Sequence, residues 1–422
     1  TQNLDTMTMP EFLEARYQSE HIKMISAVII FIFLLPYSAS IFKGLGHLFE
    51  STFHISFDFA LIILVVITGI YLVLGGYFAV TVTSFIQGII MLVGAVIMIC
   101  VLVYKAGGLT EAITTVNINY PEHVPAAQQP SWLTIASLIF MTSVGSWGLP
   151  QMVQKFYAIK NEKVIPKAAI ITTIFALVIG ITAYGSGILS HVFFDNNTVP
   201  KLANGGVNYD QIMPNLLAIK LPEALLAIIM LLILSASMSS LASLVLVSAS
   251  SIAVDLYKGY LKKDVNEKTS LIIMRSFSIL FIFATYLISK LQLGFIVTMQ
   301  SLSWGVLSGA FLAPYVFAIY SKKVTKAAAY AGIYSGAGSA IILTMALGAA
   351  NSALAASIAI IVPFIVVPIV SAFTPKVDAN VIEKAFKKYI QTMIGTGIGV
   401  FDFDAYPFGM WKGKPAFNKN YF

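Results

Sequence analysis

The stretch VTVTSFIQGIIMLVGAVIMICVLVY, residues 80–104, decides the fold class of this chain. It contains no Asp, Glu, Lys or Arg. A helix needs roughly 20 apolar residues to cross the hydrocarbon core of a bilayer, and this run is longer than that. It therefore predicts a helix that spans a membrane.

Similar apolar runs fill most of the chain on both sides of this stretch. Tight turns are expected at Gly75–Gly76 and after Lys290, and several runs are long enough to require tilting or a break. We predict about ten spans: 22–50, 55–77, 80–105, 131–156, 165–193, 222–255, 268–290, 292–320, 326–348 and 352–373.

The overall composition excludes a soluble globule. Of 422 residues, 58% are hydrophobic and 11% are charged, whereas soluble domains carry about 25% charged residues. So few charges cannot coat a body of this size in water, but lipid as the outer solvent removes that need. We expect an all-α polytopic membrane protein with the lipid bilayer as its surroundings.

The net charge of +7 does not indicate a nucleic-acid-binding protein. The charges lie in short clusters between apolar runs, as expected of the loops of a membrane protein. The chain has one cysteine, Cys100, so it forms no intrachain disulfide and no cysteine metal motif.

Lysine placement predicts the topology. The loops 155–167, 258–268 and 322–326 are rich in lysine, and they alternate with poorer segments such as 106–130, which has no Lys or Arg. Cytoplasmic loops carry the excess of Lys and Arg. Ten spans then place both ends of the chain in the cytoplasm, and we expect a multi-pass protein of a bacterial plasma membrane.

The two ends of the chain read as polar cytoplasmic segments. Residues 1–21 are expected to form a cytoplasmic loop, and residues 374–422, which contain no apolar run of span length, a cytoplasmic tail. The chain opens on such a loop without an initiator Met or a signal sequence, so we expect a segment upstream of Thr1 in the native protein.

The most informative polar stretch is SASMSSLASLVLVSASS, residues 235–251. On a helix, Ala236, Ser239, Ser240 and Ser243 fall at i, i+3, i+4 and i+7, which is one face. Hydroxyl and carbonyl oxygens suit hard cations such as sodium. Small residues also line contacts between helices in membranes, so the pattern allows either an ion site or a packing face.

A second stretch, SVGSWGLPQMVQKF at residues 143–156, predicts an interrupted helix. Gly145, Gly148 and Pro150 crowd one turn, and proline removes a backbone donor. Broken helices in transporters expose backbone groups where the substrate binds. Ser143, Ser146 and Gln151 would supply polar groups to a bound solute, and Trp147 an apolar wall. The alternative is a proline kink that binds no ligand.

Ionisable residues are almost absent from the predicted spans, which weakens a proton-relay interpretation. Lys43, His47 and Asp58 are placed near span ends. The chain contains no HExxH or GxSxG motif and no paired carboxylates inside a span, so an enzyme is not expected.

Four motifs resemble those of the sodium:solute symporter family, the sodium-coupled carriers of sugars, proline, pantothenate and sialic acid. In order, they are PEFLEARY at 10–17, GGYFAVTVTSFIQ at 75–87, WGLPQMVQKFYAIK at 147–160 and SASMSSLASLVLVSASSIAVDLYKGY at 235–260. The resemblance implies an inverted-repeat fold of five plus five core helices. It places core helices three to ten at 22–320 and two peripheral helices at 321–373, and it implies that core helices one and two precede this chain.

The same resemblance implies a sodium site formed by the carbonyl of Ala236 and the hydroxyls of Ser239 and Ser240. In some members an acid on core helix five forms a second sodium site with core helix eight. Ser84 replaces that acid here, so the second site, from Ser84 and Ser243, departs from the family pattern.

Sugar-carrying members place Asn and Tyr where this chain has Ser143 and Ser146. A sugar is therefore disfavoured, and we expect an amino acid or an organic anion.

The expected function is sodium-coupled symport of a small organic solute by alternating access, with a monomeric transport unit and Na+ as the coupling ion. Two alternatives stay open: a proton-coupled carrier, and a sensory or scaffold protein that uses the carrier fold. Without core helices one and two, residues 1–422 alone are expected not to transport and to bind sodium weakly.

Overall fold

The computed structural model describes residues 6, 8–123, 129–157, 164–261, 266–375 and 382. Almost all of them are helical, and the described part contains no strand beyond the isolated bridge between Lys201 and Val207. The tail predicted for residues 374–422 lies outside the described residues except for Thr374, Pro375 and Ile382.

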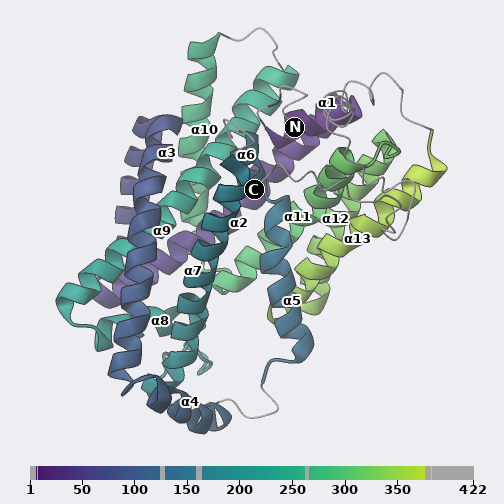
Figure 1. The fold of residues 1–422 in the computed structure, drawn as a ribbon. Coiled ribbons are helices and arrows are strands. Elements are labelled where there is room, and N and C mark those ends of the chain that lie inside the picture. The colour runs from purple at the N-terminus through teal and green to yellow at the C-terminus, as the bar shows by residue number, and fades with distance from the viewer. Residues whose placement is uncertain are drawn as a thin grey trace, which may run out of the picture.

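The helices follow one another through short connections (Figure 1). Their bounds are α1 Met9–Tyr17, α2 Glu20–Phe53, α3 Phe57–Lys105, α4 Leu109–His123, α5 Trp132–Ser143, α6 Pro150–Tyr157, α7 Ile165–Phe193, α8 Tyr209–Lys220, α9 Glu223–Ser250, α10 Glu267–Lys290, α11 Ile296–Tyr320, α12 Lys326–Leu347 and α13 Ser352–Phe373, with 3-10 turns at Gly145–Gly148 and Ala349–Asn351 and a π-helix at Ser251–Leu261.

Eight helices of the described chain are long and apolar enough to cross a membrane, and two shorter apolar stretches, Phe57–Leu72 and Trp132–Gly148, join them. This confirms an all-α polytopic membrane protein with about ten spans. The apolar side chains of α7 show what surrounds the molecule, because Ile170, Ile174 and Ile181 are 57–66% exposed. Such a surface is stable in lipid and not in water.

Helix α3 combines two predicted spans, 55–77 and 80–105, and it is helical through Gly75–Gly76, where a tight turn was expected. Thr68 donates to the Met238 sulfur and Ser239 donates to Ser84, and these two residues of α9 are neighbours. Residues 68 and 84 would lie about 24 Å apart along a straight helix. The helix therefore bends between them, and the tight turn expected at the glycine pair was wrong.

The first helix departs from the loop predicted for residues 1–21. Thr8 caps α1 by accepting a hydrogen bond from the Glu11 amide, and Met9, Phe12 and Leu13 are buried in the main core. This short helix is therefore a packed element of the fold. Sequence polarity missed it because its few apolar residues lie on a segment too short to span a bilayer.

One side of the molecule is a compact group of three helices, α11, α12 and α13 (Figure 1). Glycines allow α11 and α12 to approach closely, and a Cβ at Gly336 would overlap the backbone carbonyl of Gly309. Helix α13 also packs against α5, where Ser357 Oγ donates to the carbonyl of Ser137 at 2.8 Å. This group therefore supports the interrupted helix that α5 begins.

Candidate functional site

The hydroxyl-rich part of α9 lies in the middle of a regular helix. Ala236, Ser239, Ser240 and Ser243 are all half-buried, whereas Met238, Leu241 and Ala242 between them are buried. The apolar residues therefore fix α9 in the bundle, and the face that carries the small residues keeps access to other groups.

The structure gathers three of these hydroxyl groups into one patch. Ser239 Oγ donates to Ser84 Oγ at 3.2 Å, and Ser243 Oγ donates to the Ser239 carbonyl at 3.2 Å. Ser84 and Ser243, the positions named for a weak second sodium site, therefore both contact Ser239. We call Ser84, Ala236, Ser239, Ser240 and Ser243 the α3–α9 oxygen patch.

The chemistry of this patch fits a hard monovalent cation. Its donors are neutral hydroxyl and carbonyl oxygens, and no group of three or more His, Cys, Asp or Glu side chains that could hold a metal occurs in the described chain. Carboxylate clusters would favour a divalent ion, while neutral oxygens suit a weakly held sodium ion.

The interrupted helix predicted at residues 143–156 is present. Helix α5 ends at Ser143, a 3-10 turn runs from Gly145 to Gly148, and α6 starts at Pro150. Helix α11 lies so close that a Cβ on Gly148 would come 2.9 Å from the Cα of Ser308. The Ser308 hydroxyl donates to the Gly145 carbonyl, which satisfies one of the backbone groups that the break leaves free.

The four residues predicted to bind solute fall into two groups. Ser143 and Trp147 are exposed, with 66% of Trp147 accessible, and the half-buried Ser146 donates its hydroxyl to the Ser143 carbonyl at 2.9 Å. Gln151 is only 4% exposed, and neither its amide nitrogen nor its amide oxygen has a partner in the described structure. Buried amides are normally hydrogen-bonded, so Gln151 is the member of the set that calls for a ligand or a water.

A buried tryptophan lies beside the break, and the sequence gave no signal for it. Trp304 on α11 is 8% exposed, and its side chain hydrogen-bonds that of Tyr37 on α2. Its ring meets that of Tyr37 on α2 edge-on, with centroids 5.7 Å apart, and it borders Gly145. A single aromatic residue in an apolar span is usually a packing residue. The position of Trp304 beside the break is therefore evident only from the assembled helices.

Charged side chains occur at the outer end of the bundle. Lys43, which was placed near a span end, is 5% exposed and its ammonium lies 2.6 Å from Asp210 on α8. Lys43 also donates to the Gly294 carbonyl, and Asp210 accepts the Ile296 amide at the start of α11. Asp210 lies in a segment with little hydropathy signal, so its pairing with Lys43 could not be read from the sequence.

Charged side chains also form buried contacts at the opposite end of the bundle. Arg16 of α1 is 1% exposed and donates to the carbonyls of Ala318 and Ser321. Burial lowers the pKa of the Arg16 guanidinium below its ordinary value, with Tyr17 opposing that change. Asp255 on the π-helix is fully buried, accepts the Thr8 hydroxyl at 2.6 Å, and leaves its second oxygen without a partner in the described chain.

Comparison with known proteins places these features in one family. The profile of the sodium:solute symporter family matches residues 1–336. The chain belongs to the sodium:solute symporter family. It is therefore a multi-pass protein of the cell membrane with the sequence features of sodium-coupled transport.

Two bacterial carriers show sequence similarity to the chain. One is sodium/proline symporter 2 of Staphylococcus saprophyticus, 28% identical over 343 residues. The other is a sodium/proline symporter of Staphylococcus aureus, 29% identical over 353 residues. In both cases the match covers 79% of this chain, and the chain spans 65% of the relative's length.

The structure resembles that of a Na+-coupled sialic acid symporter in its substrate-bound outward-open state. The TM-score is 0.66 with 18% sequence identity, over 88% of this chain and 78% of that protein. At this identity the likeness shows the fold, which is the inverted-repeat carrier fold that the motifs implied.

Proposed function

We propose that this protein carries out sodium-coupled symport of a small organic solute by alternating access. The observation that carries the proposal is the α3–α9 oxygen patch, in which Ser239 joins Ser84 on one side and Ser243 on the other. Sodium is held by the Ala236 carbonyl and the Ser239 and Ser240 hydroxyls. Membership of a family of sodium symporters and the neutral character of these donors support the assignment.

The patch has a second role as an extension of the sodium site. Ser84 lies where some family members carry an acid, and it contacts Ser239 directly. Ser84 and Ser243 therefore form either a second, weaker sodium position or outer ligands of the first. A hydroxyl in place of a carboxylate lowers the charge of this position, which weakens its attraction for a cation.

The solute binds beside the interrupted helix. Gln151 supplies a buried amide without a partner in the described structure. Ser143 and Ser146 lie on the accessible side of the break, and Trp147 offers an apolar wall. The N–H group of Gln151 favours a solute with carboxylate oxygens. An amino acid or an organic anion fits this arrangement better than a sugar, whose hydroxyls need several acceptors as well.

Coupling between the two sites follows from shared packing. Val153 of α6 belongs to the same buried cluster as Ala242 and Leu244 of α9. A shift of α9 when sodium binds therefore reaches the helix that follows the break. A coupling free energy of about 1–3 kcal/mol is typical of two sites linked in this way.

The domain roles belong to the same proposal. Residues 22–320 form the transporter core, residues 321–373 form two peripheral helices, and the chain acts as a monomeric transport unit. In this proposal the protein moves its solute across the membrane without changing it chemically, and it acts neither as an enzyme nor as a sensor.

A proton-coupled carrier is the second candidate, and one observation favours it. Asp255, at the end of the predicted span 222–255, is fully buried, and one of its oxygens lacks a partner in the described structure. A carboxyl group in this position could carry a proton between two conformations.

Uptake measurements in vesicles that contain the full-length protein distinguish the two candidates. Radiolabelled proline, other amino acids and small organic acids are offered under a sodium gradient at uniform pH, and then under a pH gradient without sodium. Sodium-coupled symport predicts uptake in the first condition only, and Ser239→Ala with Ser240→Ala removes most of it. Uptake that follows only the pH gradient, and that is lost in Asp255→Asn, contradicts the sodium proposal.

A further inference from the structure

A groove between α2 and α9 lies away from both the oxygen patch and the interrupted helix. Its lining comes from the last turns of α2 and the first turns of α9, and its volume is about 610 Å³. Cavities of this size accept drug-sized molecules. The lining residues are Phe49, Thr52, Phe53, Glu223, Leu226, Ala227, Met230, Leu231 and Leu234.

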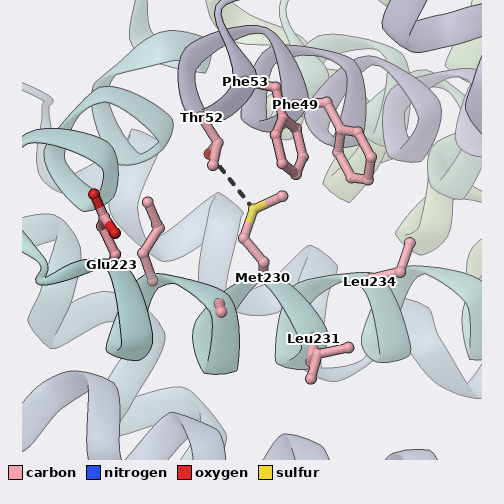
Figure 2. A pocket seen from close by; sticks show the side chains of 9 residues that line it. Phe49, Thr52, Phe53, Glu223, Met230, Leu231 and Leu234 are labelled. Atoms are coloured by element: carbon pink, nitrogen blue, oxygen red, sulfur yellow. Dashed lines mark hydrogen bonds between the residues drawn. The ribbon is translucent and has the colours of Figure 1, made fainter.

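The groove is apolar along most of its length and acidic at one end. Figure 2 shows the carboxylate of Glu223 at the start of α9, with the rings of Phe49 and Phe53 farther along on α2. Glu223 and Leu234 are separated by about 17 Å along the helix, at 1.5 Å per residue. A molecule with one charged group and an apolar body matches this length and polarity.

Glu223 is an exposed carboxylate with no ion pair in the described part of the chain. The nearest lysine in sequence, Lys220, directs its ammonium over the ring of Phe193, 5.6 Å from the centroid. Glu223 is therefore available to a cation from outside the protein.

The aromatic end of the groove favours the same kind of ligand. The rings of Phe49 and Phe53 lie 5.3 Å apart and tilted, and Phe53 is 56% exposed. Aromatic faces attract alkylammonium groups as well as hydrocarbon. Thr52 donates to the sulfur of Met230, which fixes the middle of the groove as one continuous wall (Figure 2).

We propose that this groove binds an amphipathic organic cation, with its ammonium at Glu223 and its apolar body along Phe53, Met230 and Leu234. The lysine distribution predicts that this end of α9 faces the outside, so such a ligand reaches the groove from the external medium. The groove does not share residues with the proposed sodium or solute positions. The proposal therefore stands apart from the transport mechanism.

Equilibrium binding to the full chain in nanodiscs tests this site. The cation probe is tritiated phenylpropyltrimethylammonium, and the neutral probe is 3-phenyl-1-propanol, which keeps the ring and lacks the charge. Wild type is expected to bind the cation saturably below about 1 mM. Glu223→Gln should weaken that binding roughly threefold to tenfold, because an exposed ion pair contributes little more, and it should leave the neutral probe unchanged.

Three variants serve as controls. Glu223→Asp keeps the charge and should retain binding within about twofold. Phe53→Leu keeps an apolar side chain but removes an aromatic contact to the shared phenyl group, so it should weaken both probes alike, by about threefold. Asp58→Asn removes another exposed carboxylate, outside the groove, and should change nothing.

Several outcomes overturn the proposal. If Glu223→Gln changed the affinities of the two probes equally, the groove would bind hydrocarbon, such as a lipid chain, with no preference for a charged group. An equal effect of Asp58→Asn would indicate a general surface charge, and absence of saturable binding up to about 10 mM would mean that no such site exists. Ser239→Ala with Ser240→Ala should leave probe binding intact, so failure here and failure of the sodium proposal are separate results.

Discussion

At the outer end of α2, the ammonium of Lys43 is buried 2.6 Å from Asp210, whereas in the middle of α9 the neutral hydroxyls of Ser239 and Ser84 meet at 3.2 Å and stay half-buried. The buried ion pair joins three helices, and separating its two charges would be costly. The hydroxyl groups are neutral and can exchange hydrogen-bond partners at small cost. The contrast indicates that charge fixes the ends of this bundle, while neutral oxygens occupy the middle of α9, where we propose the sodium site.

The same contrast appears at the other end of the bundle. Arg16 is almost fully buried and donates to two backbone carbonyls of the α11 region, while the amide of Gln151 near the interrupted helix has no partner among described residues. Satisfied buried groups stabilise a fold, and unsatisfied ones mark a place for a ligand. Changes in the two classes should therefore affect different measurements.

Lys43→Met should have the largest effect on stability. It leaves Asp210 buried without its counter-charge, and breaking a buried pair in this way costs about 3–5 kcal/mol. The free energy of unfolding in mixed micelles, measured by SDS titration, gives the value. The double variant Lys43→Met with Asp210→Asn should recover at least half of the loss, since Asn still accepts the Ile296 amide. A single variant that loses less than about 0.5 kcal/mol would show the pair to be solvated, like an exposed one.

Gly336→Ala should have the next largest effect, because its new Cβ overlaps the carbonyl of Gly309 on α11 and neither backbone can move freely. Overpacking of this kind costs roughly 1–3 kcal/mol. Gly338→Ala on the same helix is the matched control, since a Cβ there meets nothing within 4 Å. The same unfolding assay should show the control unchanged or slightly stabilised, and equal losses at both positions would refute the close approach of α11 and α12.

Gln151→Leu should separate solute binding from stability. It removes a buried amide that has no partner in the described structure, so the free energy of unfolding should stay the same or rise. A hydrogen bond to a charged acceptor contributes about 1.5–3 kcal/mol, so the affinity for a carboxylate solute should fall by at least about tenfold. Phe281→Leu is a control for a loss of packing, since Phe281 is fully buried away from the break. A stability loss in Gln151→Leu with unchanged solute affinity would assign this glutamine to packing.

Lys290→Met should have the smallest effect. Its ammonium lies 3.7 Å from Asp58, and the two side chains are 49% and 57% exposed. Exposed pairs of this kind contribute about 0–1 kcal/mol. The unfolding assay should therefore show little change, in contrast with Lys43→Met. A loss comparable to that of Lys43→Met would remove the distinction between buried and exposed charges on which the comparison rests.

The sequence predicted the helices and the interruption well, because both depend on local patterns. Uncharged runs such as residues 80–104 are long enough to identify spans, and Gly145, Gly148 and Pro150 act within a single turn. The tight turn predicted at the glycine pair 75 and 76 was wrong, because α3 continues through both residues.

Contacts between distant segments could not be predicted. Asp210 pairs with a lysine that precedes it by more than 160 positions, and nothing near either residue signals the other. Trp304 and Tyr37 meet only because α2 and α11 cross beside the break. Thr8 and Asp255 come from opposite parts of the chain. The grouping of Ser84 with Ser239 likewise depends on the packing of α3 against α9, which apolar runs alone do not specify.

The most direct test of the account is the binding of ²²Na+ to the full-length protein in nanodiscs, compared between wild type and Ser239→Ala with Ser240→Ala. Ser250→Ala is the matched control, because its hydroxyl bonds the Val247 carbonyl farther along α9. We predict saturable sodium binding that excess potassium does not displace, at least about tenfold weaker in the double variant, or about 1.4 kcal/mol, and unchanged in the control. Equal sodium affinity in all three proteins would contradict the claim that the neutral oxygens of α9 hold the coupling ion.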